Sequence, residues 1–296
     1  MAACPRCQRP VAVARDRCLY CGAPLDPSLV PPPSSSEPEP PGLAEGRALV
    51  LLDLSQASPG RLVEALGLSP YDAEQRVRRG GWQIHRVVAA VEAAGEVDRL
   101  RAAGFEACSL VGAEIESSSR PRLAEGGRVI AHGAELRVEG RLLSILAPDV
   151  RLVVAGAIQR EWQAEAPDPF KRRAAKKYAP SPGFRFHVHL TAEPRPIEID
   201  PEMFAFDEPL LVPMATLPEL RRWIEILAGA RGIDDGFRFV PPALGIAAPP
   251  EARDPARLLN QGRFRADDAN APKILDNLAQ FRFYSGWRGA LERRSG

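Results

Sequence analysis

Four of the chain's five cysteines lie within residues 4–21, and this cluster constrains the N-terminal fold more than any other feature. They form two C-x2-C pairs separated by ten residues: Cys4, Cys7, Cys18 and Cys21. This spacing lets four thiolates converge tetrahedrally on one ion at about 2.3 Å, as in a structural zinc site. Residues 1–26 hold too few apolar side chains for a core, so a bound metal would supply on the order of 10 kcal/mol of folding free energy.

The same segment resembles the zinc-ribbon family, which occurs at the N-termini of many bacterial proteins. The resemblance implies one structural zinc ion with four protein ligands and no open coordination position for catalysis. Iron bound as in rubredoxin uses the same ligands, and a thioredoxin-type redox pair uses a single C-x2-C, so both alternatives stay open.

Charge and hydropathy indicate a cytoplasmic protein without a transmembrane segment. Lys and Arg together number 39 against 38 for Asp and Glu, so no global field attracts nucleic acid or an anionic membrane. The apolar runs are much shorter than the roughly 18 residues of a membrane span, and the N-terminus lacks the pattern of a signal peptide. Thiols in the cytoplasm are kept reduced, which favours metal binding over disulfides.

Composition and periodicity divide the rest of the chain into four segments. Residues 27–46 are rich in Pro, Ser and Glu and are expected to form an extended linker. A small β-α-α-β-α-β domain is predicted at 47–114, a β-rich domain at 125–232 and a C-terminal extension at 233–296. The predicted fold class is therefore multidomain α+β: a zinc ribbon, the small α/β domain, then a β-rich, barrel-like domain closed by an amphipathic helix.

The segment 47–114 carries clear helix signals. Ser69 is placed to cap a helix with Pro70 at its first position and Asp72 in capping-box register, and Gly80 ends that helix. The order of elements, together with LGLSPYDAEQRV and VDRLRAAGFEACSL, resembles the C-terminal domain of the bacterial ribosomal stalk protein. The resemblance implies a docking module that presents helices to a protein partner.

Residues 125–232 alternate apolar and polar side chains with the period of two that is typical of strands. A helix is predicted to follow these strands, with Thr216 and Glu219 in capping-box register. Its apolar face consists of four residues: Leu220, Trp223, Ile224 and Leu227. Several antiparallel strands closed by one amphipathic helix resemble a pleckstrin-homology-type barrel.

A basic loop between two predicted strands is a candidate anion-binding site. Its cations are Lys171, Arg172, Arg173, Lys176 and Lys177, flanked by Phe170 and Tyr178. Cations beside aromatic side chains are typical of sites for phosphoinositide-like headgroups or nucleic acid. A solvated surface loop explains the same residues, so both interpretations stay open.

The sequence contains no recognised catalytic motif: it lacks a P-loop, H-E-x-x-H, G-x-S-x-G and a dinucleotide fingerprint. His187 and His189 alternate on one predicted strand, a geometry that offers two metal ligands. Asp234 with Asp235, and a second acidic pair at 267–268, lie in loop-like sequence and are predicted to be solvated charges.

Three functions from different classes are compatible with these features. The first, which we expect, is a non-catalytic zinc-binding adaptor or scaffold that mediates protein–protein contacts. The second is a nucleic-acid-associated protein that uses the ribbon and the 171–178 loop; an anionic membrane surface is a further candidate partner of that loop. The third is an enzyme whose site lies in the β-rich half and uses His187, His189 or the acidic pairs.

Overall fold

The structure is a computed structural model. It describes residues 2–3, 10–11, 43, 45–130, 132–163, 183–207, 217–242, 245–246 and 273–295. The chain divides into two compact units, residues 1–39 and 40–296. In the first, β1 (Ala2–Ala3) pairs antiparallel with β2 (Pro10–Val11). The four predicted zinc ligands and the five cations of the basic loop lie outside the described residues.

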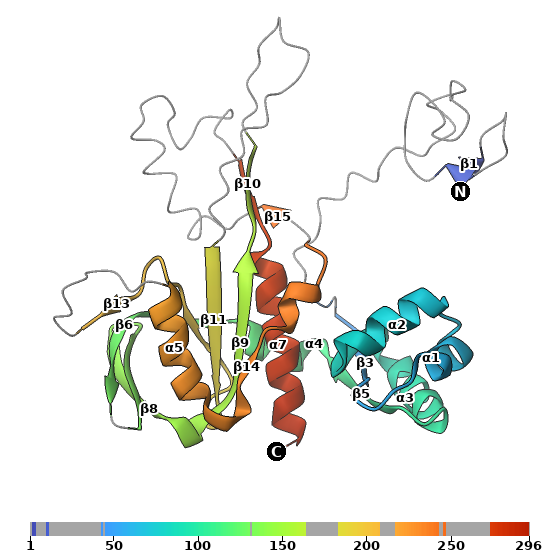
Figure 1. Cartoon of the computed structure of the whole chain (residues 1–296), viewed down its shortest axis with the longest axis horizontal. Helices are drawn as coiled ribbons and strands as arrows, with labels where there is room; N and C mark the ends of the chain where they lie inside the picture. The colour runs from blue at the N-terminus through green and yellow to red at the C-terminus, as the bar shows by residue number, and fades with distance from the viewer. Residues whose placement is uncertain are drawn as a thin grey trace, which may run out of the picture. The chain divides into compact units, whose positions relative to one another are not determined.

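Helices and sheets together build the second unit, which confirms the α+β class (Figure 1). Its first sheet is antiparallel, with three strands in the order β4-β3-β5. The chain forms it and its helices in the order β3 (Arg47–Asp53), α1 (Pro59–Leu66), α2 (Pro70–Arg79), β4 (Trp82–Ala89), α3 (Ala93–Ala102) and β5 (Glu106–Val111). This is the predicted β-α-α-β-α-β order.

The predicted cap of α2 is also confirmed. The backbone N–H of Asp72 donates to Ser69 Oγ at 3.1 Å, and Ser69 Oγ donates to Asp72 Oδ2 at 2.7 Å. Pro70 is the first residue of the helix, and Gly80 follows its last residue with a φ of 63°. A left-handed φ of this kind favours glycine, so the local sequence determines where α2 begins and ends.

The apolar sequence of β3 is uninterrupted because the strand is buried on both faces. Ala48, Val50 and Leu52 pack into a core with side chains of α1, α2 and α3. Leu49 and Leu51 belong to a different core, because successive side chains of a strand point to opposite faces. The three-stranded sheet therefore needs another part of the chain to cover its second face.

The second sheet has eight strands, in the order β14-β9-β11-β12-β6-β7-β8 with β13 paired to β6. The strands are β6 (Arg122–Ile130), β7 (Gly133–Val138), β8 (Arg141–Leu146), β9 (Val150–Ile158), β11 (Gly183–Leu190), β12 (Ile197–Ile199), β13 (Ala205–Phe206) and β14 (Ile233–Asp234). Neighbours are antiparallel, except that β12 and β13 run parallel to β6 and β14 runs parallel to β9. Over the described residues this sheet is open, and closure into a barrel stays a prediction.

Helix α5 (Leu217–Ala228) covers the large sheet with the predicted apolar face. All four residues of that face are buried: Leu220, Trp223, Ile224 and Leu227. The indole of Trp223 lies 5.5 Å from the ring of Phe204, between ring centroids, and 5.8 Å from that of Phe206. Aromatic contacts of this kind add to the burial energy and fix where the helix sits on the sheet.

The predicted C-terminal extension at 233–296 contains a helix that lies between two sheets of the second unit. A third sheet of three strands, in the order β10-β16-β15, precedes it: β10 (Arg160–Gln163), β15 (Gly245–Ile246) and β16 (Lys273–Asp276). Strand β16 leads into α7 (Leu278–Ser295), which lies between the three-stranded sheet of β3 and the large sheet (Figure 1).

Helix α7 builds a core that is shared by the small β4-β3-β5 sheet and the large eight-stranded sheet. Its buried members in this core are Leu278, Phe281, Tyr284, Trp287, Ala290 and Leu291. Leu49 and Leu51 of β3 join the core from one side, and Leu152 and Val154 of β9 from the other. One helix therefore covers the second face of the small sheet and part of the large sheet at once.

Close packing around α7 depends on two glycines. Helix α4 (Gly112–Ser119) crosses α7 at Gly286, where a Cβ would lie 2.8 Å from Ser119 Cβ. At Gly289 a Cβ would overlap the ring of His189 on β11. Side chains at these positions would force the helix away from its neighbours, so glycine permits the observed approach.

Candidate functional site

The two histidines predicted as candidate ligands lie on β11 and point into the interface with α7. His187 and His189 are fully buried, and Ser285 of α7 lies between their rings. Ser285 Oγ is 2.8 Å from His187 Nδ1 and 2.7 Å from His189 Nε2. The structure thus brings the two histidines together through a serine that the sequence did not single out.

Charged side chains extend this buried network. Glu198 of β12 lies beside His187, with 3.0 Å between Oε2 and Nε2. Arg282 of α7 binds the same carboxylate through Nε at 2.9 Å and Nη2 at 3.1 Å. Arg185 of β11 approaches it at 3.7 Å and pairs with Asp200 at 2.6 Å. The result is a cluster of paired charges between the sheet and the helix.

The hydrogen bonds determine where the protons lie. A neutral His187 donates from Nε2 to the Glu198 carboxylate, so its Nδ1 accepts the hydroxyl proton of Ser285. Ser285 Oγ then accepts a hydrogen bond from His189 Nε2, whose ring is the donor. In these three contacts each atom thus acts either as the donor or as the acceptor of the shared proton, as in other buried polar networks.

Burial and neighbouring charges shift the titration of the network in opposite directions. Burial would raise the pKa of Glu198, but His187 and Arg282 outweigh it and hold that pKa well below its usual range. Burial lowers the pKa of His187 despite its bond to Glu198. Burial, with His187 and Arg293 nearby, lowers the pKa of His189 even further. Both imidazoles are therefore neutral at pH 7 and the carboxylate is ionised.

Chemically, Ser285, His187 and Glu198 have the order of a nucleophile, a base and an acid. However, Ser285 and His187 are both 0% exposed, so a substrate does not reach the hydroxyl in this conformation. Among the described residues, no group of three or more His, Cys, Asp or Glu side chains is placed to hold a metal ion. The geometry supports a structural role for this network, in which it fixes α7 to the large sheet.

The neutral histidines predict how stability depends on pH. Because burial lowers the pKa of both imidazoles in the folded chain, the unfolded chain binds more protons below about pH 6.5, and the free energy of unfolding falls as the pH falls. At its steepest the loss approaches about 1.4 kcal/mol per pH unit for each histidine. Urea denaturation at a series of pH values from about 8 to about 5 measures this slope.

His189→Gln tests the assignment, because the amide N–H replaces the donor to Ser285 but does not titrate. The variant should lose part of the slope, and His132→Gln, at an exposed position, is the control. A slope that His189→Gln leaves unchanged would contradict the assignment.

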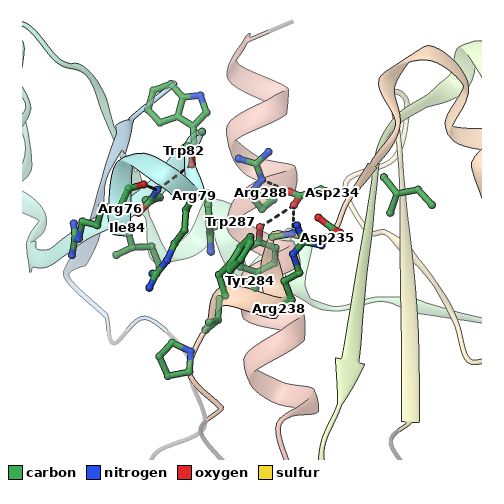
Figure 2. A pocket seen from close by; sticks show the side chains of 18 residues that line it. Arg76, Arg79, Trp82, Ile84, Asp234, Asp235, Arg238, Tyr284, Trp287 and Arg288 are labelled. Carbon is green, nitrogen blue, oxygen red and sulfur yellow. Dashed lines mark hydrogen bonds and ion pairs between the residues drawn. The ribbon is translucent and has the colours of Figure 1, made fainter. Parts of the chain in front are cut away.

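A second group of polar side chains lines a cleft of about 470 Å³ (Figure 2). The end of α2 and the start of β4 form one wall, with Arg76, Arg79 and Trp82. The turn that follows β14, which contains a short 3-10 helix (Gly236–Phe239), forms the opposite wall, and α7 forms the base. The two walls are far apart in sequence and become neighbours because α7 lies between them.

The acidic pair predicted to be solvated belongs to this cleft, and for Asp234 the prediction is wrong. Asp234 accepts hydrogen bonds from Arg288 Nε at 2.6 Å, Tyr284 OH at 3.0 Å and the backbone N–H of Gly236 at 2.9 Å. Burial and then the Asp234 carboxylate raise the pKa of Tyr284, so the phenol stays a donor. Asp235 pairs at the surface with Arg238. Helix α7 supplies two of the three donors to Asp234, which its local sequence does not reveal.

Two arginines of the cleft lack such partners. Among the residues that the structure describes, no side chain pairs with the guanidinium of Arg76 or Arg79, although both line the cleft. Arg76 is half-buried, and burial followed by the nearby charge of Arg79 lowers its pKa. The Asp72 carboxylate offsets this lowering in part but forms no ion pair with Arg76, so two neighbouring guanidinium groups without a described hydrogen-bonded anion favour binding of one.

Comparisons with protein-family models, curated proteins and solved structures found no match. Within the described part of the chain, no helix has the length and apolar character needed to cross a membrane. Function is therefore inferred from the geometry of the buried network and of the cleft.

Proposed function

We propose that the protein is a non-catalytic, zinc-binding adaptor of the cytoplasm that mediates protein–protein contacts. In this proposal residues 1–26 form a zinc ribbon around Cys4, Cys7, Cys18 and Cys21, and residues 47–114 act as a stalk-like docking module. The barrel-like region at 125–232 serves as the scaffold. The motif spacing supports the ribbon, and the element order of β3 to β5 supports the module.

The observation that carries the proposal is a contrast between two groups of polar side chains. The group with the chemistry for catalysis, around Ser285 and His187, is buried and internally paired. The group at the surface cleft includes Arg76 and Arg79, whose guanidinium groups form no hydrogen bond or ion pair with another described side chain. A protein whose candidate nucleophile, Ser285, is buried and whose cleft exposes arginines without a described ion pair is suited to binding a partner rather than to catalysis.

In-cell cross-linking of the full chain, followed by mass spectrometry, tests this function. The purified protein should carry about one zinc ion, and protein partners should be cross-linked to both units, 1–39 and 40–296. Cys18→Ser should release the zinc and the partners of residues 1–39, and leave those of 40–296, because residues 40–296 form a compact unit of their own.

Cys108→Ser is the matched control, since Cys108 is the half-buried thiol of β5 and burial raises its pKa. This variant should keep both the zinc and every partner. Recovery of nucleic acid alone, or of no cross-linked protein, would overturn the adaptor in favour of the second or third hypothesis.

A further inference from the structure

We infer that the cleft between α2 and the turn after β14 binds an extended acidic segment of a partner protein, aligned along strand β4. The inference rests on the proposed adaptor function and specifies the chemistry of its partner. Three observations carry it: the unpaired cations, the free strand edge and the mixed lining of the cleft.

The first observation is the pair of arginines at the end of α2. Arg76 and Arg79 lie one turn apart at the end of α2 and reach the same cleft (Figure 2). A carboxylate between them would gain charge-assisted hydrogen bonds, and it would compensate the half-buried guanidinium of Arg76. Arg78 lies on the same last turn but does not line the cleft, so it shares the helix-end position without the site.

The second observation is the edge of the small sheet. In the order β4-β3-β5, β4 is an outer strand, and β3 is the one described strand that pairs with it. Trp82, Gln83 and Ile84, which begin this strand, line the cleft. An outer strand presents unpaired backbone N–H and C=O groups, and an extended peptide can bind them as an additional strand.

The third observation concerns the lining, which suits a peptide better than a nucleic acid. Trp82, Ile84 and Pro241 provide apolar surface for side chains of the partner. Asp234 and Asp235 stand on the wall opposite Arg76 (Figure 2). There, among the described residues, their ion pairs with Arg288 and Arg238 leave no free cation for the next phosphate of a polyanion. A peptide that alternates acidic and apolar residues places its carboxylates on one wall and avoids the other, because successive side chains of a strand alternate.

Fluorescence anisotropy with short labelled peptides tests the inference on the full chain. The probe is an alternating Glu-Val peptide of about eight residues, compared with Ser-Val and Lys-Val peptides of the same length. Arg76→Ser combined with Arg79→Ser should weaken binding of the Glu-Val probe about tenfold or more, whereas Arg78→Ser should stay within about twofold. Thermal unfolding of the variants should stay close to that of the parent, because these side chains form no hydrogen bond or ion pair with another described side chain and the attraction of Asp72 to Arg76 is weak at a solvated helix end.

A second probe tests the strand. The Glu-Val peptide with alternate N-methyl groups cannot donate its backbone N–H groups to an edge, so it should also bind about tenfold more weakly. Equal binding of the Ser-Val peptide, or tighter binding of an oligothymidine with loss in the same double variant, would overturn the inference.

Two outcomes separate the site from the proposed function. In the first, host proteins cross-link to residues 40–296 of the parent and of the double arginine variant alike, and the Glu-Val probe does not bind. This result would support the adaptor function and contradict the assignment of the cleft. In the second, the probe binds as expected but host proteins cross-link to neither unit. This result would support peptide binding in the cleft and contradict the adaptor function.

Discussion

Truncation of the chain before Leu278 should abolish cooperative folding of the whole unit 40–296, and not only of its C-terminal part. The removed helix α7 covers Leu49 and Leu51 of the small sheet together with Leu152 and Val154 of the large sheet. Without it, both sheets expose an apolar face that Ile115 of α4 and Phe237 cover only in part. Far-UV circular dichroism during thermal unfolding should show no sharp transition.

A milder substitution keeps this prediction testable if the truncated chain aggregates. Phe281 is 0% exposed and packs against the rings of His187 and Phe237. Phe281→Ala should lower the free energy of unfolding by about 3–5 kcal/mol, the usual cost of removing a buried ring. Phe239→Ala removes a ring that is 42% exposed and should cost less than about 0.5 kcal/mol. A truncated chain that still melts cooperatively would contradict the central role of α7.

Local signals in the sequence predicted the elements that local interactions determine. The cap of α2 depends on Ser69 and Asp72, which are three residues apart. The face of α5 follows from helical periodicity, because that helix is buried on one side and solvated on the other. In both cases the residues that determine the structure are neighbours in the sequence.

Helix α7 was not predicted because its sequence lacks the amphipathic periodicity on which helix predictions depend. It contacts α4, β9 and the small sheet, so apolar side chains occur around most of its circumference rather than on one stripe. Gly286 and Gly289 further lower its helix propensity, although they permit the close approach of Ser119 and His189. Tertiary packing, and not local preference, therefore stabilises this helix.

The candidate sites were only partly accessible from the sequence for the same reason. The spacing of His187 and His189 correctly placed both on one strand, but Ser285 is 98 positions from His187. The two walls of the cleft, near Arg76 and near Asp234, become neighbours through α7. Contacts over such separations depend on the order of strands and helices in space, which short motifs do not encode.

Glu198→Ala should be among the most destabilising single substitutions in the chain. The carboxylate is paired with Arg282 at 2.9 Å and with His187 at 3.0 Å, and its side chain is 5% exposed. Removing it takes from Arg282 a carboxylate bound through two nitrogens and from His187 its hydrogen-bond acceptor, whereas Arg185 keeps Asp200. Removing one partner of a buried ion pair costs about 3–5 kcal/mol, because the remaining charge is desolvated and no longer has an opposite charge beside it.

Two comparisons decide whether the charge is responsible. Glu225→Ala removes a carboxylate that pairs with Arg221 at the surface of α5, where both side chains are about half exposed, and should cost about 0–1 kcal/mol. Glu198→Gln keeps the volume and an acceptor oxygen but removes the charge, so its cost should approach that of Glu198→Ala. Urea denaturation at pH 7 measures all three variants. If Glu198→Gln stays within about 1 kcal/mol of the parent, shape rather than charge holds α7 against the large sheet, and the electrostatic account of the network is wrong.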